Sequence, residues 1–286
     1  MLPGRAMDQV LTGDKAAEAG ALVTAEQPNR RLWARFGMPL TVFVCLMGSW
    51  EALIWLLDVP GFLVPAPSAI VQALWSGLVT GLYFSHAAVT MFEAVVGFAI
   101  GSLLGLALGT VIVVFPTMER IVYPYVVALQ TVPKVAIAPL MVVWFGFGIT
   151  SKILVVALVS LFPVLVNVMA GLRSIDQDRL DLLGALAASR WQIFRYVRFP
   201  NALPFIFAGL NTAIVLAVIG AIVAEFVGSN YGLGFLILQA NYQLDIAGAF
   251  SLFVVLSVMG VALHGSLKWL ERRCVFWINI EARNGL

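Results

Sequence analysis

The sequence is poor in charged residues. Only 11% of its 286 residues are Asp, Glu, Lys or Arg, whereas 61% are hydrophobic and the mean hydropathy is +0.97. A soluble domain ordinarily has about 25% charged residues, so this chain has too few to cover a surface that faces water. Several apolar stretches also approach the ~20 residues that a helix needs to cross a bilayer. The composition therefore excludes an ordinary soluble protein and indicates an integral membrane protein.

Residues that commonly carry chemistry are scarce too. The cysteines, Cys45 and Cys274, and the histidines, His86 and His264, lie far apart, and their spacing fits neither a disulfide framework nor a metal site. No lysine follows a glycine, so there is no phosphate-binding loop, and no H-E-x-x-H, C-x-x-C or G-x-S-x-G pattern occurs. We therefore expect no cofactor and no enzymatic activity. If ATP drives this protein, the ATPase is another polypeptide.

Long apolar stretches make up most of the chain. They lack the alternation of transmembrane β-barrel strands, so we expect an all-α, polytopic membrane protein. The hydropathy pattern predicts about six transmembrane helices. They are expected at 37–57, 87–114, 121–146, 151–171, 204–228 and 247–270.

Basic residues are distributed unevenly between the two sides that six crossings would create. Segments 58–86 and 229–246 contain no Lys or Arg, and the third turn on that side has only Lys152. Because cytoplasmic loops carry an excess of Lys and Arg, we expect both termini in the cytoplasm. The polar segment 1–36 lacks the apolar core of a signal peptide, so it is expected to be a cytoplasmic tail, as is 274–286.

The second predicted span carries a glycine at every fourth position. Gly97, Gly101, Gly105 and Gly109 would form one smooth helix face, which allows two backbones to approach closely in lipid. Glu93 lies one turn earlier on the same face, so we expect its carboxylate to point into protein or water rather than into lipid. We interpret the glycine face as a packing surface without a chemical role.

Proline interrupts the third predicted span at Pro124, Pro133 and Pro139. Lys134 follows one of these prolines near the middle of the span. Broken membrane helices occur where they are packed in protein or line a wet cavity, and an intramembrane lysine is a candidate for contact with a transported solute. An equally good interpretation is that Lys134 binds a backbone carbonyl or a carboxylate and only holds the kink.

Other polar residues also fall within the predicted spans. Such residues more often form hydrogen bonds between helices than contact a ligand. Glu225 precedes a glycine-rich turn, Gly228–Gly234, which slightly favours a capped re-entrant turn over a gate or a contact with a binding protein. Together with Lys134, the candidates for a substrate pathway are Gln130, Asn167, Asn211 and Glu225.

A polar segment, 174–204, separates the fourth and fifth predicted spans. Two capping-box patterns, Ser174-x-x-Gln177 and Ser189-x-x-Gln192, each predict the start of a short helix. Pro200 predicts the end of the second helix, because proline has no N–H and clashes with the preceding turn. The two helices are expected at 175–187 and 190–199.

This segment resembles the cytoplasmic EAA loop of ABC-importer permeases, whose pattern is E-A-A, three residues, G, nine residues and I-x-L-P. Asp181-Leu182-Leu183 stands at the E-A-A positions, Ala187 at the glycine and Val197–Pro200 at I-x-L-P, so only the proline is identical. Flanking stretches strengthen the signal and resemble the nitrate/sulfonate/taurine branch of these permeases. They are WFGFG at 144–148, SKIL at 151–154, AGLRS at 170–174, ASRWQ at 188–192, PNALP at 200–204 and GLGFLI at 232–237.

The resemblance extends from about Glu51 to Arg273 and implies the type I ABC-importer permease fold, with a transmembrane permease domain at 37–273 in the inner membrane. It also implies that the protein forms a translocation pathway and that a separate ATPase binds its 174–204 loop. The implied partners are two copies of an ABC ATPase, a periplasmic or lipid-anchored substrate-binding protein, a second permease copy in a homodimer, and membrane lipid, with no nucleic acid. The implied ATPase-coupling residues are Asp181, Leu182, Leu183, Leu186, Ala187 and Pro200.

The solute is expected to be small. The resemblance implies an anion such as nitrate, a sulfonate or taurine, with a neutral heterocycle such as a pyrimidine precursor as the alternative. Lys134 favours an anion. A secondary transporter driven by an ion gradient is a rival class, but it would ordinarily show inverted repeats and paired interrupted helices, whereas one interrupted helix is predicted here. A membrane scaffold or sensor without transport activity would not require polar residues in the spans.

Overall fold

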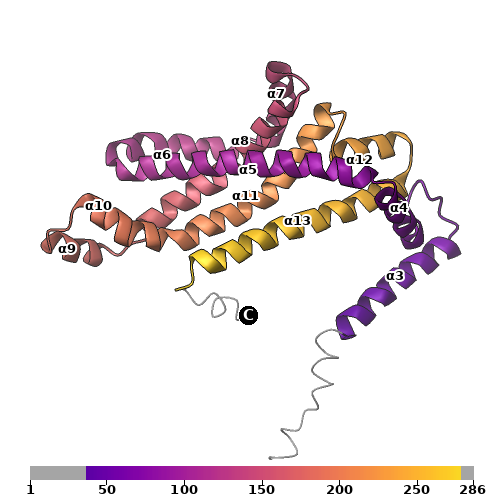
Figure 1. Cartoon of the computed structure of the whole chain (residues 1–286), viewed down its shortest axis with the longest axis horizontal. Coiled ribbons are helices and arrows are strands. Elements are labelled where there is room, and N and C mark those ends of the chain that lie inside the picture. The colour runs from indigo at the N-terminus through magenta and orange to yellow at the C-terminus, as the bar shows by residue number, and fades with distance from the viewer. Residues whose placement is uncertain (1–36, 278–286) are drawn as a thin grey trace, which may run out of the picture. The chain divides into compact units, whose positions relative to one another are not determined.

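Residues 37–277 of the chain are described in this computed structural model (Figure 1). Within this range every regular element is a helix, as the hydropathy pattern predicts. The tail expected at 1–36 and most of the tail expected at 274–286 lie outside the described residues.

The smaller of two units contains α3, Met38–Leu56, and the short segment Ala66–Ser68. Glu51 of α3 accepts hydrogen bonds from the backbone N–H and from the hydroxyl group of Ser68, at 3.0 and 2.7 Å. Ser68 lies in the first turn of α4, Pro67–Val79, where the positive end of the helix dipole favours a carboxylate. The Glu51 carboxylate therefore ties Ser68 to α3.

The larger unit holds the other described helices. In chain order after α4 they are α5 (Leu82–Val114), α6 (Pro116–Thr131), η2 (Lys134–Ile137), α7 (Ala138–Phe145), α8 (Ile149–Arg173), α9 (Gln177–Ala185), α10 (Arg190–Ile193), η3 (Phe194–Arg198), α11 (Phe199–Gly228), α12 (Leu233–Tyr242) and α13 (Ile246–Cys274).

Among residues 37–277, five helices are long and apolar enough to cross a membrane. They are α3, α5, α8, α13 and the continuous helix from Arg190 to Gly228. The remaining predicted span corresponds to α6 and η2–α7, two helical segments that meet at a bend of 82°. The expectation of about six spans in an all-α protein is therefore confirmed for the described chain.

The bend in this broken span lies at Pro133, directly before η2. Pro139 lies in the first turn of α7, where a missing N–H leaves no bond unmade. Pro124 lies inside α6 without ending it, so the prediction that Pro124 interrupts the helix is wrong. Membrane helices tolerate proline where small local adjustments or neighbouring groups satisfy the freed backbone carbonyl.

The core of the larger unit forms where α8 packs along α5 and along α11. The glycine face of α5 lies against α8. A Cβ atom added at Gly105 would lie 2.6 Å from the carbonyl oxygen of Leu161, and one added at Gly109 would lie 2.9 Å from that of Leu165. The two backbones thus approach as closely as the glycine spacing predicts, and the expected packing role is confirmed.

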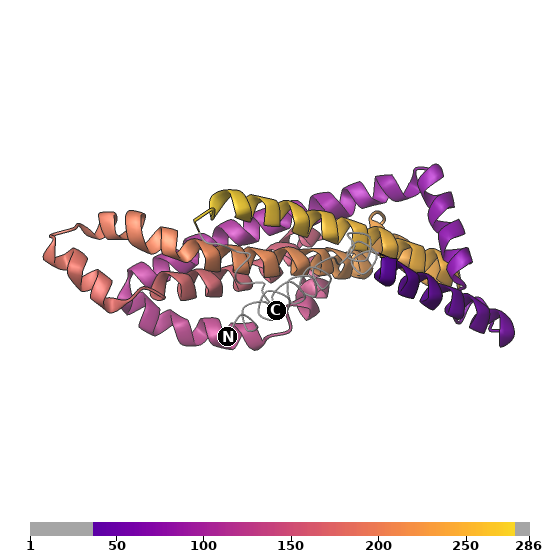
Figure 2. The same cartoon turned by 90° about the horizontal axis from the view of Figure 1, so that it is seen from below.

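The long helices connect two opposite ends of the larger unit. In Figure 1, α9 and α10 lie at one end and α12 lies at the other, and Figure 2 shows the α9–α10 loop again at one end of the long helices. The helices α5, α8 and α11 run between these ends, and α13 packs along α11 and against α12. The polar loop and α12 are therefore far apart but joined by continuous helices.

Candidate functional site

The first loop helix, α9, begins later than the sequence predicts. Asp176 is its N-cap, and the Asp176 carboxylate accepts a hydrogen bond from the backbone N–H of Asp178 at 3.2 Å. Ser174 instead donates its hydroxyl group to the carbonyl of Gly171 in the last turn of α8. The capping box predicted for Ser174 and Gln177 is therefore wrong, because Ser174 ends the preceding helix.

The end of α9 explains the glycine of the EAA pattern. The N–H of Ala188 donates to the carbonyl of Leu183, and that of Ala187 donates to Gly184, both at 3.0 Å, which is the Schellman arrangement. Such a turn places a left-handed residue just after the helix, and Ala187 has a φ of 54° there. Glycine adopts this backbone conformation freely, whereas for an L-residue with a Cβ the left-handed conformation costs ~1–2 kcal/mol in conformational energy. Ala187 therefore keeps the geometry of the pattern under strain.

The outer surface of α9 carries an exposed apolar pair beside polar and charged side chains. Leu182 and Leu186 lie one turn apart and are 62% and 70% exposed, whereas Leu183 is half-buried. Asp181 is exposed and accepts a hydrogen bond from the side chain of Gln177 at 3.0 Å. Of the residues expected to contact an ATPase, Leu182 and Leu186 are the apolar ones most open to a partner. An exposed apolar pair on a capped helix outside the spans is well suited to docking.

The second loop helix begins as predicted. Ser189 and Gln192 exchange both hydrogen bonds of the capping box at the start of α10. The helix then continues through the π turn η3 into α11, and the whole stretch from Arg190 to Gly228 is one helix.

Pro200 does not end this helix, so that prediction is wrong. In the π turn the N–H of Phe199 donates to the carbonyl of Phe194, five residues earlier. The wider turn places Pro200 in the first turn of α11. Proline is tolerated there because a backbone N–H at this position would have no hydrogen-bond partner within α11. The second loop helix is therefore continuous with the following span.

A buried ion pair joins α5 to α8 near the other end of the unit. Lys152 Nζ lies 3.1 Å from Glu93 Oε1, and the two side chains are only 6% and 0% exposed. Lys152 also donates to the hydroxyl group of Ser229 at the end of α11, at 2.6 Å. The expectation that Glu93 points into protein is confirmed. Lys152 was expected in an outer turn, but it is a core residue that connects three helices.

Side chains from α5 and α11 hold the start of α12. The Glu225 carboxylate accepts hydrogen bonds from Thr90 Oγ1, at 2.7 Å, and from the N–H of Gly234. Thr90 Oγ1 in turn accepts one from the N–H of Leu233 at 2.8 Å. The carboxylate also faces the positive end of the α12 dipole, where a negative charge is stabilised.

Gly232 allows the carboxylate to come this close. Its φ is 110°, and any Cβ atom at this position would overlap the carboxyl group of Glu225. The N–H of Gly232 donates to His86 Nδ1 at 3.0 Å. The three consecutive N–H groups of Gly232–Gly234 thus all have side-chain partners, as buried backbone groups require. The capped turn expected after Glu225 is present.

Sequence reasoning missed His86, Thr90 and Lys152 as members of this buried cluster. A signal for two of them was available, because His86, Thr90, Glu93 and Gly97 recur at the spacing of one helix face. Lys152 gave no such signal, because its partner lies 59 residues away in the chain. Within residues 37–277, no group of three His, Cys, Asp or Glu residues could hold a metal ion.

The five candidates for a substrate pathway do not form one site. Glu225 belongs to the cap of α12. Asn167 donates to the carbonyl of Pro163 in its own helix at 2.8 Å. Asn211 donates to the carboxylate of Glu271 in α13 at 2.9 Å. These three residues therefore make contacts within or between helices.

Lys134 and Gln130 lie together at the bend of the broken span. Lys134 Nζ donates to the backbone carbonyl of Gln130 at 2.9 Å and lies 4.8 Å from the centroid of the Phe162 ring. The side chain of Gln130 is exposed and that of Lys134 is partly exposed. The contact with a backbone carbonyl is thus present, and the Lys134 side chain remains partly exposed.

Comparison with known families identifies the class of protein. Residues 97–275 match the family of binding-protein-dependent transport system inner membrane components. The match runs from the glycine face of α5 to the end of α13 and includes the α9–α10 loop. The chain belongs to this family and is a multi-pass permease subunit of an ABC importer in the inner membrane.

Relatives with named substrates cover most of the chain. The riboflavin transport system permease protein RibX of Chloroflexus aurantiacus is 36% identical over 86% of this chain and 91% of the relative. The formylaminopyrimidine transport permease protein ThiX of Halalkalibacterium halodurans is 36% identical over 84% and 95%. The taurine transport system permease protein TauC of Escherichia coli is 30% identical over 83% and 88%. The resemblance to the sulfonate/taurine branch is confirmed, and permeases for ring compounds match as well.

Solved structures share the fold. A chain of the MetNI methionine ABC transporter, solved in inward-facing conformations, superposes with a TM-score of 0.58 at 19% identity, over 74% of this chain and 98% of that chain. A chain of an amino acid ABC transporter gives a TM-score of 0.56 at 19% identity, over 70% and 97%. At this identity the likeness concerns the fold alone, and it confirms the type I ABC-importer permease fold.

Proposed function

We propose that this permease binds a separate ABC ATPase through α9, so that ATP binding by the ATPase moves the spans. The main support for this contact is the exposed pair Leu182 and Leu186. They lie on a helix that is capped at both ends and is outside the spans. The working importer would contain two permease copies, two ATPase copies and a periplasmic or lipid-anchored substrate-binding protein. This chain would contribute the pathway and leave hydrolysis to its partner.

The helix from Arg190 to Gly228 provides a physical route from the docking surface to the other end. At 1.5 Å per residue, its 39 residues extend over roughly 58 Å. At the far end, Glu225 and Ser229 connect this helix to α5, α8 and α12. A displacement of α9 would therefore move these helices as a block. ATP must bind the closed ATPase more tightly than the open one, since otherwise it could not shift the permease between inward- and outward-facing states.

The basic residues of the loop support a cytoplasmic position for α9. We place the tails 1–36 and 274–286 on the same side and α12 on the periplasmic side. With Cys45 and Cys274 replaced, a membrane-impermeant maleimide should label Tyr196→Cys only from the inside and Tyr242→Cys only from the outside. The two tyrosines are 72% and 83% exposed, so access should depend on the side alone. Labelling of Tyr242→Cys only from the cytoplasmic side would contradict this orientation.

Leu182→Asp and Leu186→Asp should each weaken ATPase binding by more than tenfold. A charge placed in an apolar docking surface loses its water without gaining a counter-charge, which typically costs at least ~2 kcal/mol, and about 1.4 kcal/mol is a factor of ten. Both side chains are exposed, so the permease itself should fold normally. The measurements are co-purification of the ATPase and substrate-stimulated hydrolysis in reconstituted membranes.

Leu244→Asp is the matched control for these variants. Leu244 is 64% exposed just after α12, and the same change there should leave ATPase binding unaltered. Ala187→Gly should also preserve docking, because glycine suits the left-handed backbone at that position. If Leu182→Asp and Leu186→Asp both retain the ATPase, α9 is not the docking element and the proposal fails.

The solute that we assign is a small nitrogen heterocycle of the riboflavin or formylaminopyrimidine kind. The relatives that bear these names are 36% identical to this chain, compared with 30% for the taurine permease. A sulfonate-like anion is the second candidate, and the partly exposed ammonium group of Lys134 supports it. Lys134 and Phe162 suit both classes, because the ammonium group donates to oxygen atoms and the aromatic face packs on rings.

Lys134→Met should lower solute uptake about tenfold while the permease still assembles with its ATPase. The change removes a charge-assisted hydrogen bond to the solute, and such bonds contribute about 1.5–3 kcal/mol. Uptake of labelled solute and co-purification of the ATPase are measured on the same preparation. Lys134→Arg keeps the charge and should retain more uptake. Normal uptake by Lys134→Met, or failure of the complex to assemble, would leave Lys134 with a structural role only.

A further inference from the structure

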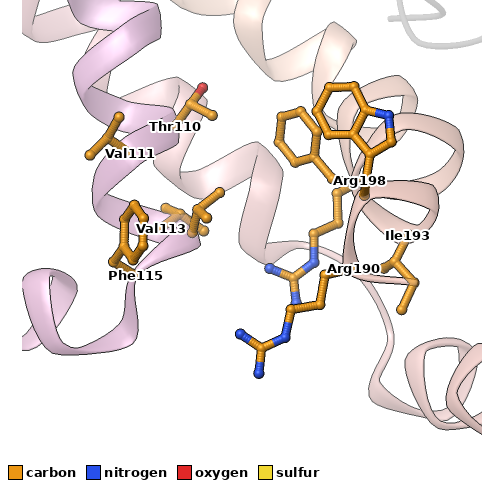
Figure 3. A pocket seen from close by; sticks show the side chains of 10 residues that line it. Thr110, Val111, Val113, Phe115, Arg190, Ile193 and Arg198 are labelled. Carbon is orange, nitrogen blue, oxygen red and sulfur yellow. The ribbon is translucent and has the colours of Figure 1, made fainter. Parts of the chain in front are cut away.

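A cavity of about 580 Å³ lies between the end of α5 and the α10–η3 segment (Figure 3). One wall is the apolar last turn of α5, and the other combines aromatic, aliphatic and basic side chains. The lining residues are Thr110, Val111, Val113, Val114 and Phe115 from α5 and its end, and Arg190, Trp191, Ile193, Phe194 and Arg198 from the loop helix.

Two arginines supply the charge of this cavity. Figure 3 shows the guanidinium groups of Arg190 and Arg198 extending into the space that faces the end of α5. The lysine and arginine residues that form ion pairs within residues 37–277 are Lys152, Arg173 and Lys268. Neither Arg190 nor Arg198 therefore has a carboxylate partner in the described part of the chain. An anion entering the cavity would meet two positive charges that form no ion pair with a carboxylate of residues 37–277.

The cavity lies where a membrane span ends. α5 is one of the spans, and it ends at Val114. Val111 and Val114 are 42% and 44% exposed, and Trp191 across the cavity is 66% exposed. Tryptophan is enriched where a protein passes from hydrocarbon to water, and valine side chains on a span face acyl chains. Apolar surface and cationic groups therefore adjoin at the depth of the lipid headgroups.

We propose that this cavity binds one anionic phospholipid of the cytoplasmic leaflet. Its phosphate would lie between Arg190 and Arg198, and an acyl chain would cover the wall formed by Val111 and Val114. The proposal rests on the orientation given above, in which the α9–α10 end faces the cytoplasm, where anionic lipids attract basic segments. A lipid fits the cavity better than a free phosphate, because free phosphate would leave the apolar wall uncovered. It also fits better than the ATPase, because we assign the ATPase contact to Leu182 and Leu186.

The test measures lipid binding to the purified full-length permease without its ATPase. The delipidated protein is titrated with dioleoylphosphatidylglycerol or dioleoylphosphatidylcholine, and native mass spectrometry gives the bound fraction. We expect phosphatidylglycerol to bind at least about tenfold more tightly. Arg190→Gln combined with Arg198→Gln should lower its affinity on the order of thirtyfold, since each basic residue near an anionic lipid contributes about fivefold.

Two further variants separate this site from the general charge of the loop. Arg179→Gln combined with Arg195→Gln removes the same charge outside the cavity and should cost less than about threefold in affinity, because only distant attraction is lost. Val114→Trp keeps both cavity arginines and fills the space, so it should lose phosphatidylglycerol as the double arginine variant does.

Four results would overturn the proposal. In the first, the two double arginine variants lose lipid affinity equally; in the second, Val114→Trp binds the lipid as the wild type does. In the third, excess glycerol 1-phosphate displaces the lipid. In the fourth, the variant Arg190→Gln with Arg198→Gln still binds the lipid but no longer binds the ATPase. The third result would indicate a soluble anion and the fourth an ATPase contact. Docking of the ATPase on α9 is tested by the Leu182→Asp pull-down, which does not depend on lipid binding. The docking proposal and the lipid proposal can therefore be rejected independently of each other.

Discussion

Lys152→Met is expected to destabilise the permease by about 3–5 kcal/mol, the typical cost of breaking a buried ion pair by removing one partner. The Glu93 carboxylate would remain fully buried without its counter-charge, and Ser229 would lose its contact with α8. Thermal unfolding of the purified protein in detergent, followed by tryptophan fluorescence, should show a clearly lower midpoint temperature and a lower yield.

The double variant Glu93→Leu with Lys152→Met is the control. Replacing both members of a buried pair by apolar side chains is often close to neutral, so this variant should recover most of the lost stability. If the single variant is as stable as the wild type, the pair does not hold α5 to α8. If the double variant is no better than the single one, the loss comes from packing rather than from the unpaired charge.

Gly101→Leu is expected to have the second largest effect. A Cβ atom at Gly101 would overlap the carbonyl group of Ala157 in α8, and its other near neighbours are also backbone atoms of Ala157 at 3.0 Å. Backbone atoms cannot move aside as a flexible side chain can, so leucine should push the two helices apart. Overpacking of this kind costs about 1–3 kcal/mol or more, and Gly101→Ala should cost less than Gly101→Leu. Detergent stability and yield are the measurements.

Gly260→Ala in α13 is the matched control for this prediction. A Cβ atom there would meet no atom within 4 Å, so alanine should be neutral or should stabilise the helix by up to ~1 kcal/mol. Unchanged stability of Gly101→Leu would show that α5 and α8 separate without penalty and that their close contact is not needed.

Features that depend on local sequence could be predicted well. Apolar length gave the spans, because a membrane helix must satisfy its own backbone. The glycine spacing indicated the close face of α5, since small residues at every fourth position have few other uses in lipid. The Ser189 capping box was confirmed, whereas the same local pattern at Ser174 was not, because the Ser174 hydroxyl group caps the end of α8 instead.

Features that depend on distant partners could not be predicted. Lys152 looked like an outer-turn residue, because only the folded chain brings it to Glu93. Thr90 and His86 gain their roles from the N–H groups at the start of α12, which lie more than 140 residues later. The prediction for Pro200 was wrong for a different reason. The rule that proline ends a helix assumes hydrogen bonds between residues four apart, whereas in η3 they join residues five apart.

The π turn at Phe194–Arg198 also determines the direction in which the loop faces. Each residue of an α-helix rotates the chain by ~100°, so a π turn offsets the helix before it from the helix after it. Deleting one residue there would restore α-helical turns and would rotate α10, with α9 attached, by about that angle around the axis of α11. Leu182 and Leu186 would then point in another direction even though both side chains were still present. The number of residues in η3 thus sets the direction in which α9 points relative to the membrane helices.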